Sequence, residues 1–286
     1  MPALRPPRFV SRLVLGVVLV AGGVGVVSAD ELSDPCEDHV DDPIALPWRE
    51  SGVDAARGGC LHADVGAALR GRALIATDDF YGTIGGELTL AVRLLESDRL
   101  EWGFALRVLD GLFVQNAVLS TEELAYGPVT GHIAFGQRGA RAGKALARAL
   151  YARLELPFTR SRLDGSSGAL QLGVAETWHV HRFVRVHLHG ALLGWYASAA
   201  TGRDGRAALM TSADGALTVT SWLSLFAGLD AQLGWYGWGL DHVAARTGAH
   251  WRVKGLWRLQ LAAGLPLAGE ERQDLVFTLA VRRDLD

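Results

Sequence analysis

His187 and His189 lie two positions apart in a segment rich in β-branched and polar residues. In an extended strand this spacing places both imidazoles on one face, together with Arg185. Two imidazoles on one face can bind a transition metal when a neighbouring strand supplies a third ligand, for which His132 is a candidate. No acidic residue close in the sequence completes such a site, so the pattern favours a hydrated basic surface. We therefore predict neither a metal site nor any cofactor.

A membrane-embedded hydrolase, of the lipid A deacylase or phospholipase type, is an alternative function. Such an enzyme needs a nucleophile, a base and an acid. Ser221, His181 and Glu176 lie near predicted turns and are the candidates, but nothing in the sequence fixes their mutual geometry. Neither a Gly-x-Ser-x-Gly nor a His-Glu-x-x-His motif occurs. We therefore predict no catalytic residue and keep the hydrolase as an alternative.

Charged residues of both signs recur at alternate positions of otherwise apolar segments. Together with the two histidines, these residues are predicted to line a water-filled interior: Glu87, Arg93, Glu101, Arg107, Arg153, Glu155, Arg185, His187, His189, Asp230 and Arg258. Arg252 and Arg282 follow the same pattern. Arginine–carboxylate pairs between neighbouring strands would make the wall of this interior rigid. Because arginines outnumber acids in this set, an open pore would favour anionic solutes.

These side chains lie in runs of about ten residues in which apolar and polar residues alternate. Such alternation is typical of strands in a membrane barrel. In one such run the apolar positions are Leu88, Leu90, Val92 and Leu94, and the intervening positions are Glu87, Thr89, Ala91 and Arg93. The intervening positions carry charged and small residues, whereas the inner face of a soluble sandwich requires large apolar ones. One face of each strand therefore requires apolar surroundings, and the other requires water or salt partners.

In lipid, an open sheet of such strands would leave the backbone groups of its edges without hydrogen-bond partners, and closure removes the edges. The predicted fold class is therefore all-β, a single closed antiparallel transmembrane β-barrel. Twelve strands are predicted, at about residues 62–76, 87–96, 99–110, 123–137, 145–158, 168–178, 183–197, 206–219, 222–235, 246–253, 256–266 and 273–283. The turn at 138–144 breaks the alternation of short and long connections, so ten or fourteen strands remain alternatives.

The N-terminal part of the sequence differs in composition from the rest. Residues 1–29 combine a basic head, an uncharged apolar run and small residues at the end, as in a secretory signal peptide. Residues 30–60 hold nine acidic residues against Arg49 and Arg57, a net charge of −7. We expect residues 30–61 to form either a mobile periplasmic tail or a plug against the basic interior, and residues 62–286 to form the barrel.

Cys36 and Cys60 are the two cysteines of the chain, and both lie in the acidic segment. In an oxidising periplasm they are predicted to form a structural disulfide. The remainder of the chain is nearly neutral, which gives no sign of nucleic-acid binding.

From about Leu150 onward, the segments 154–159, 165–172, 222–232 and 273–279 follow one another in a recognisable order. This series resembles an uncharacterised family of Gram-negative outer-membrane β-barrel proteins, domain of unknown function 3187. The resemblance covers roughly the last half of the chain, and its motifs are strand–turn patterns rather than catalytic signatures. It implies an envelope barrel and carries over no active site. The expected partners are outer-membrane lipid, lipopolysaccharide and the barrel-assembly machinery.

The sequence therefore predicts an exported protein of the outer membrane of a Gram-negative bacterium. Its expected role is passive: a narrow diffusion channel that favours anions, or a structural barrel of the envelope.

Overall fold

The computed structural model describes residues 60–61, 63–76, 81–97, 99–115, 120–125, 129–141, 144–156, 166–199, 202–234, 240–253, 256–269 and 275–285. The predicted signal peptide and nearly all of the acidic segment, Cys36 included, lie outside these residues. Among the residues that are described, no helix is long and apolar enough to cross a membrane.

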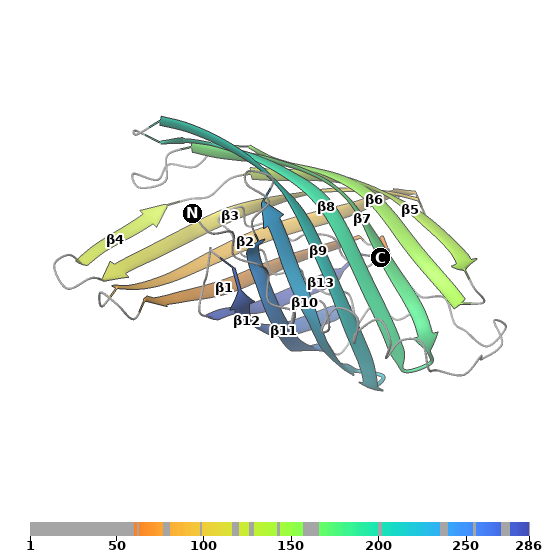
Figure 1. Cartoon of the computed structure of the whole chain (residues 1–286). Coiled ribbons are helices and arrows are strands. Elements are labelled where there is room, and N and C mark those ends of the chain that lie inside the picture. Colours follow the sequence, from red (N-terminus) through yellow and green to blue (C-terminus); the bar gives the residue numbers. More distant parts are fainter. Residues whose placement is uncertain are drawn as a thin grey trace, which may run out of the picture.

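Almost the whole described chain is in β-strands, which follow one another as an antiparallel meander (Figure 1). The strands are β1 Asp64–Ala76, β2 Tyr81–Ser97, β3 Leu100–Gln115, β4 Ser120–Ala125, β5 Val129–Arg141, β6 Lys144–Leu156, β7 Ser166–His181, β8 Val184–Ala199, β9 Gly202–Thr220, β10 Leu223–Gly234, β11 Leu240–Val253, β12 Trp257–Ala268 and β13 Leu275–Asp284.

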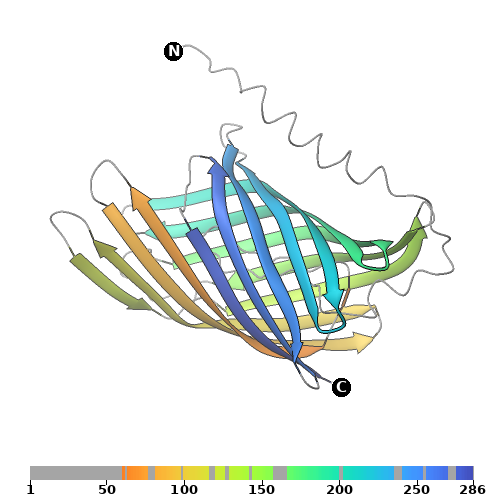
Figure 2. The ribbon, with the colours of Figure 1, turned by 90° about the horizontal axis from the view of Figure 1, so that it is seen from below.

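The sheet closes on itself. Ala67 of β1 faces Leu90 of β2 on one side and Val281 of β13 on the other, so the first and last strands of the barrel are neighbours. Figure 2 shows this seam, with orange β1 beside dark blue β13. Closure gives β1 and β13, the first and last strands of the wall, a hydrogen-bonded neighbour on both sides, so neither is left as an open edge.

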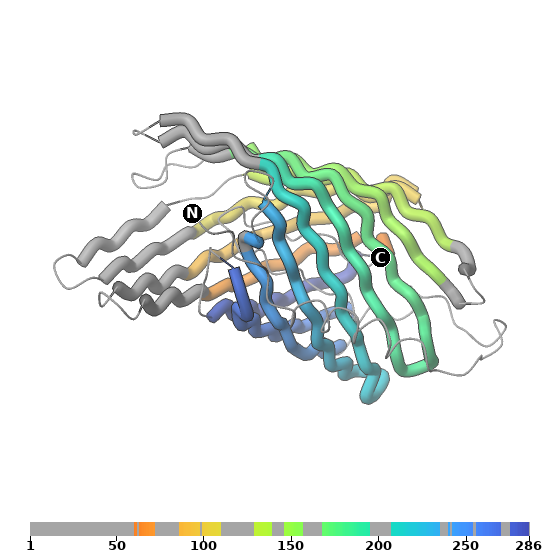
Figure 3. Tube along the Cα trace, viewed as in Figure 1, coloured from red at the N-terminus to blue at the C-terminus, as the bar shows by residue number. Residues whose placement is uncertain are grey.

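Twelve strands make up the wall, as the sequence predicted. β4 and β5 both pair with β3, β4 along residues 110–115 and β5 along residues 100–106, so the two segments are one interrupted strand of the wall. The Cα trace in Figure 3 follows the same tilted strands around one interior. The alternatives of ten or fourteen strands are therefore excluded.

The connections differ in length between the two ends of the barrel. The short connections span residues 98–99, 142–143, 182–183, 221–222 and 254–256; we call their end of the barrel the turn end, and the opposite end the loop end. The sequence predicted a longer turn at 138–144. β5 and β6 pair as far as Arg141 and Lys144, so the connection between these strands is only two residues long. At the loop end the strands extend further than predicted: β2 begins at Tyr81 and β3 ends at Gln115, since each supplies the hydrogen bonds of the other.

The two faces of the wall differ as the alternation requires. Leu90, Phe104 and Leu150 are 46%, 53% and 56% exposed and point outward. Arg93, Gln171 and Ser224 are at most 1% exposed and point inward. An outer surface of large apolar side chains is stable in a lipid bilayer and costly in water.

The interior also contains an apolar cluster that the sequence did not suggest. Phe226 on β10 is 3% exposed and packs inside the wall with Ala216, Ala244, Ala262 and Val276. Its ring lies 4.8 Å from that of His250, between centroids. Phe226 therefore occupies space on the β9–β13 side of the interior that a uniformly polar lining would leave open.

Candidate functional site in the barrel interior

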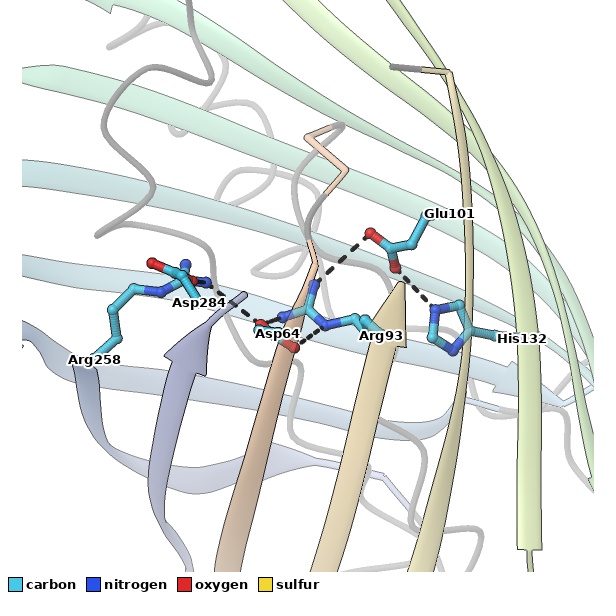
Figure 4. Close-up of polar contacts among 6 residues, drawn as sticks. All are labelled: Asp64, Arg93, Glu101, His132, Arg258 and Asp284. Carbon is cyan, nitrogen blue, oxygen red and sulfur yellow. Dashed lines mark hydrogen bonds and ion pairs between the residues drawn. The ribbon is translucent and has the colours of Figure 1, made fainter. Parts of the chain in front are cut away.

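A chain of charged side chains crosses the seam near the turn end (Figure 4). Asp64, at the start of β1, accepts a hydrogen bond of 2.6 Å from Nε of Arg93 on β2 and a second one from the same guanidinium. On the other side, Nη2 of Arg258 on β12 lies 3.4 Å from Asp64 Oδ2. Arg258 also binds Asp284 on β13. One carboxylate thus connects the first strand of the barrel with strands on both sides of the seam.

The same chain continues along the wall away from the seam. Arg93 Nη1 lies 3.9 Å from a carboxylate oxygen of Glu101 on β3, whose other oxygen is 2.8 Å from Nε2 of His132 on β5. Figure 4 shows these contacts in a line across the inner face. The network therefore spans β12, β13, β1, β2, β3 and β5.

Two further networks join other charged residues of the lining. Glu87 binds Arg70 of β1 and lies 3.2 Å from Nε of Arg107 on β3. On the opposite side of the barrel, Arg246 of β11 donates to Asp214 of β9 at 2.6 Å and lies 3.6 Å from Asp230 of β10. The Arg246 side chain is only 1% exposed. Pairing is what makes burial of these charges tolerable, because an unpaired buried charge is strongly destabilising.

The two histidines that suggested a metal site make neutral polar contacts instead. His187 Nδ1 is 2.9 Å from the hydroxyl of Thr177. His189 hydrogen-bonds to the hydroxyl of Tyr151, which also accepts a bond of 2.9 Å from Gln171. His132 lies on β5, and β6 and β7 separate it from β8. In the part of the chain that the structure describes, no group of three or more His, Cys, Asp or Glu side chains is placed to hold a metal ion.

The other residues expected to line the interior also lie at inward-facing positions of their strands. Arg153, Glu155 and Arg185 are between 2% and 6% exposed, and Asp230 is 8% exposed. Arg252 and Arg282 are half-buried near the turn end.

Several of the best-paired charges were missed at the sequence level: Asp64, Arg70, Asp214, Arg246 and Asp284. They could have been found from the alternation of inward and outward positions along each strand. Asp214 and Arg246 continue the inward phase of buried Ala216 and His250. Among the described residues, six carboxylates and seven arginines are buried, so the buried interior has one more arginine than carboxylate.

A cavity lies inside the wall on the β2–β7 side. Its charged and polar lining includes Arg93, Glu101, His132, Tyr151 and Arg153. Cys60 and Leu61, which precede β1, also line it. Cys60 is buried, whereas Cys36 lies outside the described residues, so the predicted disulfide stays a prediction.

The candidate hydrolase residues lie on β7 and in the turn after β9. Glu176 alternates with inward Ala175 and Thr177, so it faces outward, and its carboxylate binds Arg148 at 2.7 Å and the Trp178 ring nitrogen at 3.1 Å. His181 ends β7, whereas Ser221 lies in the turn after β9. β8 lies between these two strands in the sheet, and the Glu176 carboxylate binds Arg148 and Trp178 rather than His181.

Comparison with known proteins gave structural matches only: no family model and no curated protein matches the chain. An outer-membrane channel from Pseudomonas putida F1 superposes with a TM-score of 0.63 at 16% identity, covering 89% of this chain and all of that one. The chain has the fold of an outer-membrane β-barrel. The KdgM porin, solved with disordered oligogalacturonate, matches with a TM-score of 0.50 at 8% identity, over 77% of this chain and 99% of that one. At these identities the likeness is one of fold, and the specific resemblance noted in the sequence stays a prediction.

Proposed function

We propose that this protein is a narrow passive channel of the Gram-negative outer membrane, surrounded there by lipid and lipopolysaccharide. The observation that carries the proposal is the division of the wall into two faces. Leu90, Phe104 and Leu150 point outward and suit lipid, whereas Arg93, Gln171 and Ser224 point inward. A closed wall with a charged lining provides a path for polar solutes through an apolar layer. The two solved barrels of similar fold, an outer-membrane channel and a porin, support the same reading.

The ion selectivity of this channel follows from the balance of its buried charges. Seven arginines and six carboxylates are buried in the described interior, and ion pairs join members of the two sets, as between Arg70 and Glu87, Arg93 and Asp64, and Arg246 and Asp214. A surplus of one arginine gives a small preference for anions, much weaker than a ring of uncompensated arginines would give.

Single-channel recording of the refolded mature protein in a planar bilayer tests the proposal. Steady openings are expected, with a reversal potential in a salt gradient that indicates weak anion preference. A folded barrel that conducts no current under any voltage would overturn the channel and leave the structural barrel of the envelope as its role.

A matched pair of variants on β9 ties the current to the interior. Ala208 points inward and is 3% exposed, whereas the adjacent Ala207 points outward. Ala208→Trp is expected to lower the conductance by roughly half, because side chains set the width of a small barrel. Ala207→Trp adds the same bulk on the lipid side and should leave the conductance unchanged. Equal conductance of both variants would place the current path outside the barrel.

A further inference from the structure

The outer face of the barrel carries an ion pair between β6 and β7. Arg148 lies between Ala147 and Ala149, which are 0% and 5% exposed and point inward, so its own side chain points outward. Glu176 of β7 also faces outward and lies directly opposite Arg148 in the register of the two strands. Arg148 Nε donates a hydrogen bond of 2.7 Å to Glu176 Oε1, and Nη2 donates a second one to the same oxygen. Two opposite charges thus lie side by side on the face that requires apolar surroundings.

The depth of this pair in the membrane follows from its neighbours along the strands. On the loop side of the pair, Leu150 of β6 and Leu172 of β7 point outward and are 56% and 50% exposed. On the turn side, the ring nitrogen of Trp178 donates a hydrogen bond of 3.1 Å to Glu176 Oε2. Tryptophan and charged residues are stable on the lipid face near the membrane interfaces, and the short turns of bacterial outer-membrane barrels are periplasmic. The pair therefore lies at the headgroup level of the periplasmic leaflet.

The pair keeps hydrogen-bonding groups for a ligand on its exposed side. Within the described residues, Arg148 contacts Glu176 through Nε and Nη2, which leaves the two N–H groups of Nη1 for another acceptor. The Arg148 side chain is 36% exposed and that of Glu176 is 18% exposed. Gln137 of β5 is exposed and faces Arg148 in the register on the other side. An amide, a guanidinium and a carboxylate therefore form one row on three adjacent strands, which are about 4.8 Å apart.

This row matches the headgroup of a zwitterionic phospholipid. Phosphate oxygens accept hydrogen bonds from a guanidinium, and an ammonium group donates hydrogen bonds to a carboxylate. In a phosphoethanolamine headgroup an ethylene group joins the phosphate to the ammonium, so the two charges can reach side chains on neighbouring strands. A phosphoglycerol headgroup brings no cation to Glu176, and a trimethylammonium group brings no N–H donor. The exposed Leu150 and Leu172 provide an apolar surface for acyl chains, which free phosphate lacks.

We propose that Arg148 and Glu176 form a binding site for phosphatidylethanolamine of the periplasmic leaflet on the outer face of β5–β7. The lipid phosphate binds Arg148 and Gln137, and the lipid ammonium binds Glu176. The site lies on the outside of the wall, so it does not depend on whether the interior conducts ions.

Native mass spectrometry of the refolded mature protein tests the choice of lipid. The protein is released from detergent in the presence of equal amounts of phosphatidylethanolamine, phosphatidylcholine and phosphatidylglycerol with identical acyl chains. The wild-type protein should retain phosphatidylethanolamine at least about threefold more than either of the others, the difference expected from one partly exposed ion pair. Equal retention of the three lipids by the wild type overturns the proposal, and this comparison needs no variant.

Two variants and a matched control locate the bound lipid. Glu176→Gln removes the partner of the ammonium, so the preference for phosphatidylethanolamine should be lost. Arg148→Gln should lower the retention of all three lipids, because each contains a phosphate. Arg283→Gln is the control: it removes an exposed arginine beside Trp257 on β13, away from β6 in the sheet, and should keep the wild-type preference. The heat-dependent shift in detergent electrophoresis checks that each variant is folded.

Three further results would contradict the site. A preference for phosphatidylethanolamine that survives both Glu176→Gln and Arg148→Gln places the bound lipid elsewhere on the barrel. Stronger retention of phosphatidylglycerol than of phosphatidylethanolamine by the wild type would mean that the arginine alone selects the headgroup, which overturns the zwitterionic ligand. A wild-type dimer that Glu176→Gln dissociates would assign the ion pair to a contact between two copies of the chain in place of lipid.

Discussion

At the level of single side chains, the interior is organised by carboxylates that each serve more than one cation. Asp64 binds Arg93 and lies 3.4 Å from Arg258, and Glu87 contacts both Arg70 and Arg107. Arg246 is the reverse case, because one guanidinium lies between Asp214 and Asp230. Removing a buried charged side chain that pairs with two others leaves both partners without a counter-charge where little water can replace it.

Asp64→Asn tests this arrangement at the seam. The substitution keeps the size of the side chain but removes the negative charge that faces two arginines. We expect a loss of roughly 3–5 kcal/mol in the free energy of unfolding, the usual cost of breaking a buried ion pair. Urea unfolding of the refolded barrel, followed by tryptophan fluorescence, measures this change.

Asp284→Asn is the matched control, because Asp284 binds Arg258 and its side chain is 25% exposed. Its cost should be well below that of Asp64→Asn, since water can replace part of the lost contact. Equal destabilisation by the two substitutions would show that sharing at Asp64 has no special energetic weight.

At the level of the strands, register decides which large side chains the interior can hold. Phe226 of β10 faces Gly248 of β11 across the inner surface. A Cβ atom at position 248 would lie 2.5 Å from the Phe226 ring and 2.3 Å from the carbonyl of Leu261 on β12. Gly248 therefore makes the close approach of β10, β11 and β12 possible around the apolar cluster.

Gly248→Val is expected to destabilise the barrel by about 1–3 kcal/mol, the usual range for overpacking a filled interior. The unfolding midpoint in urea and the temperature at which the folded band disappears in semi-native electrophoresis both measure it. Gly215→Val on β9 is the control, since nothing lies within 4 Å of a Cβ atom there. A stable Gly248→Val barrel would mean that the β10–β12 wall adjusts more easily than its contacts indicate.

At the level of the whole molecule, closure depends on two strands that are far apart in the sequence. β1 and β13 pair over ten positions, from Asp64 opposite Asp284 to Ala73 opposite Leu275. Without β13 this pairing is lost, and β1 and β12 would both become unpaired edges in an apolar environment.

A chain that stops at residue 274 should therefore fail to form a closed barrel. The full mature chain is expected to migrate as a compact band in unheated detergent electrophoresis and to shift on boiling, whereas the truncated chain should migrate as unfolded protein at both temperatures. Removal of Asp286 alone is the control and should leave the compact band. A truncated chain that still gives a heat-sensitive compact band would show that the seam is not required for closure.

The amino-acid sequence by itself determined the direction in which residues of the clearly alternating runs point. Alternation is a local property, because successive side chains of a strand lie on opposite faces. Leu88, Leu90 and Val92 could therefore be assigned outward, and Glu87 and Arg93 inward, without knowledge of any partner. The twelve strands of the wall followed from counting such runs, and ladder pairing then extended several of them at the loop end.

Only the tertiary structure decided which inward residues meet. Contacts across a sheet depend on register and on closure, and both join residues remote in sequence: Asp64 and Arg258 are 194 positions apart. For this reason the sequence could suggest a metal pair at His187 and His189 but not their contacts with Thr177 and Tyr151. The acidic segment 30–61 was expected to be either a tail or a plug, and nearly all of it lies outside the described residues. Local alternation determined which residues face inward and which face outward. Register and closure determined which inward residues are in contact.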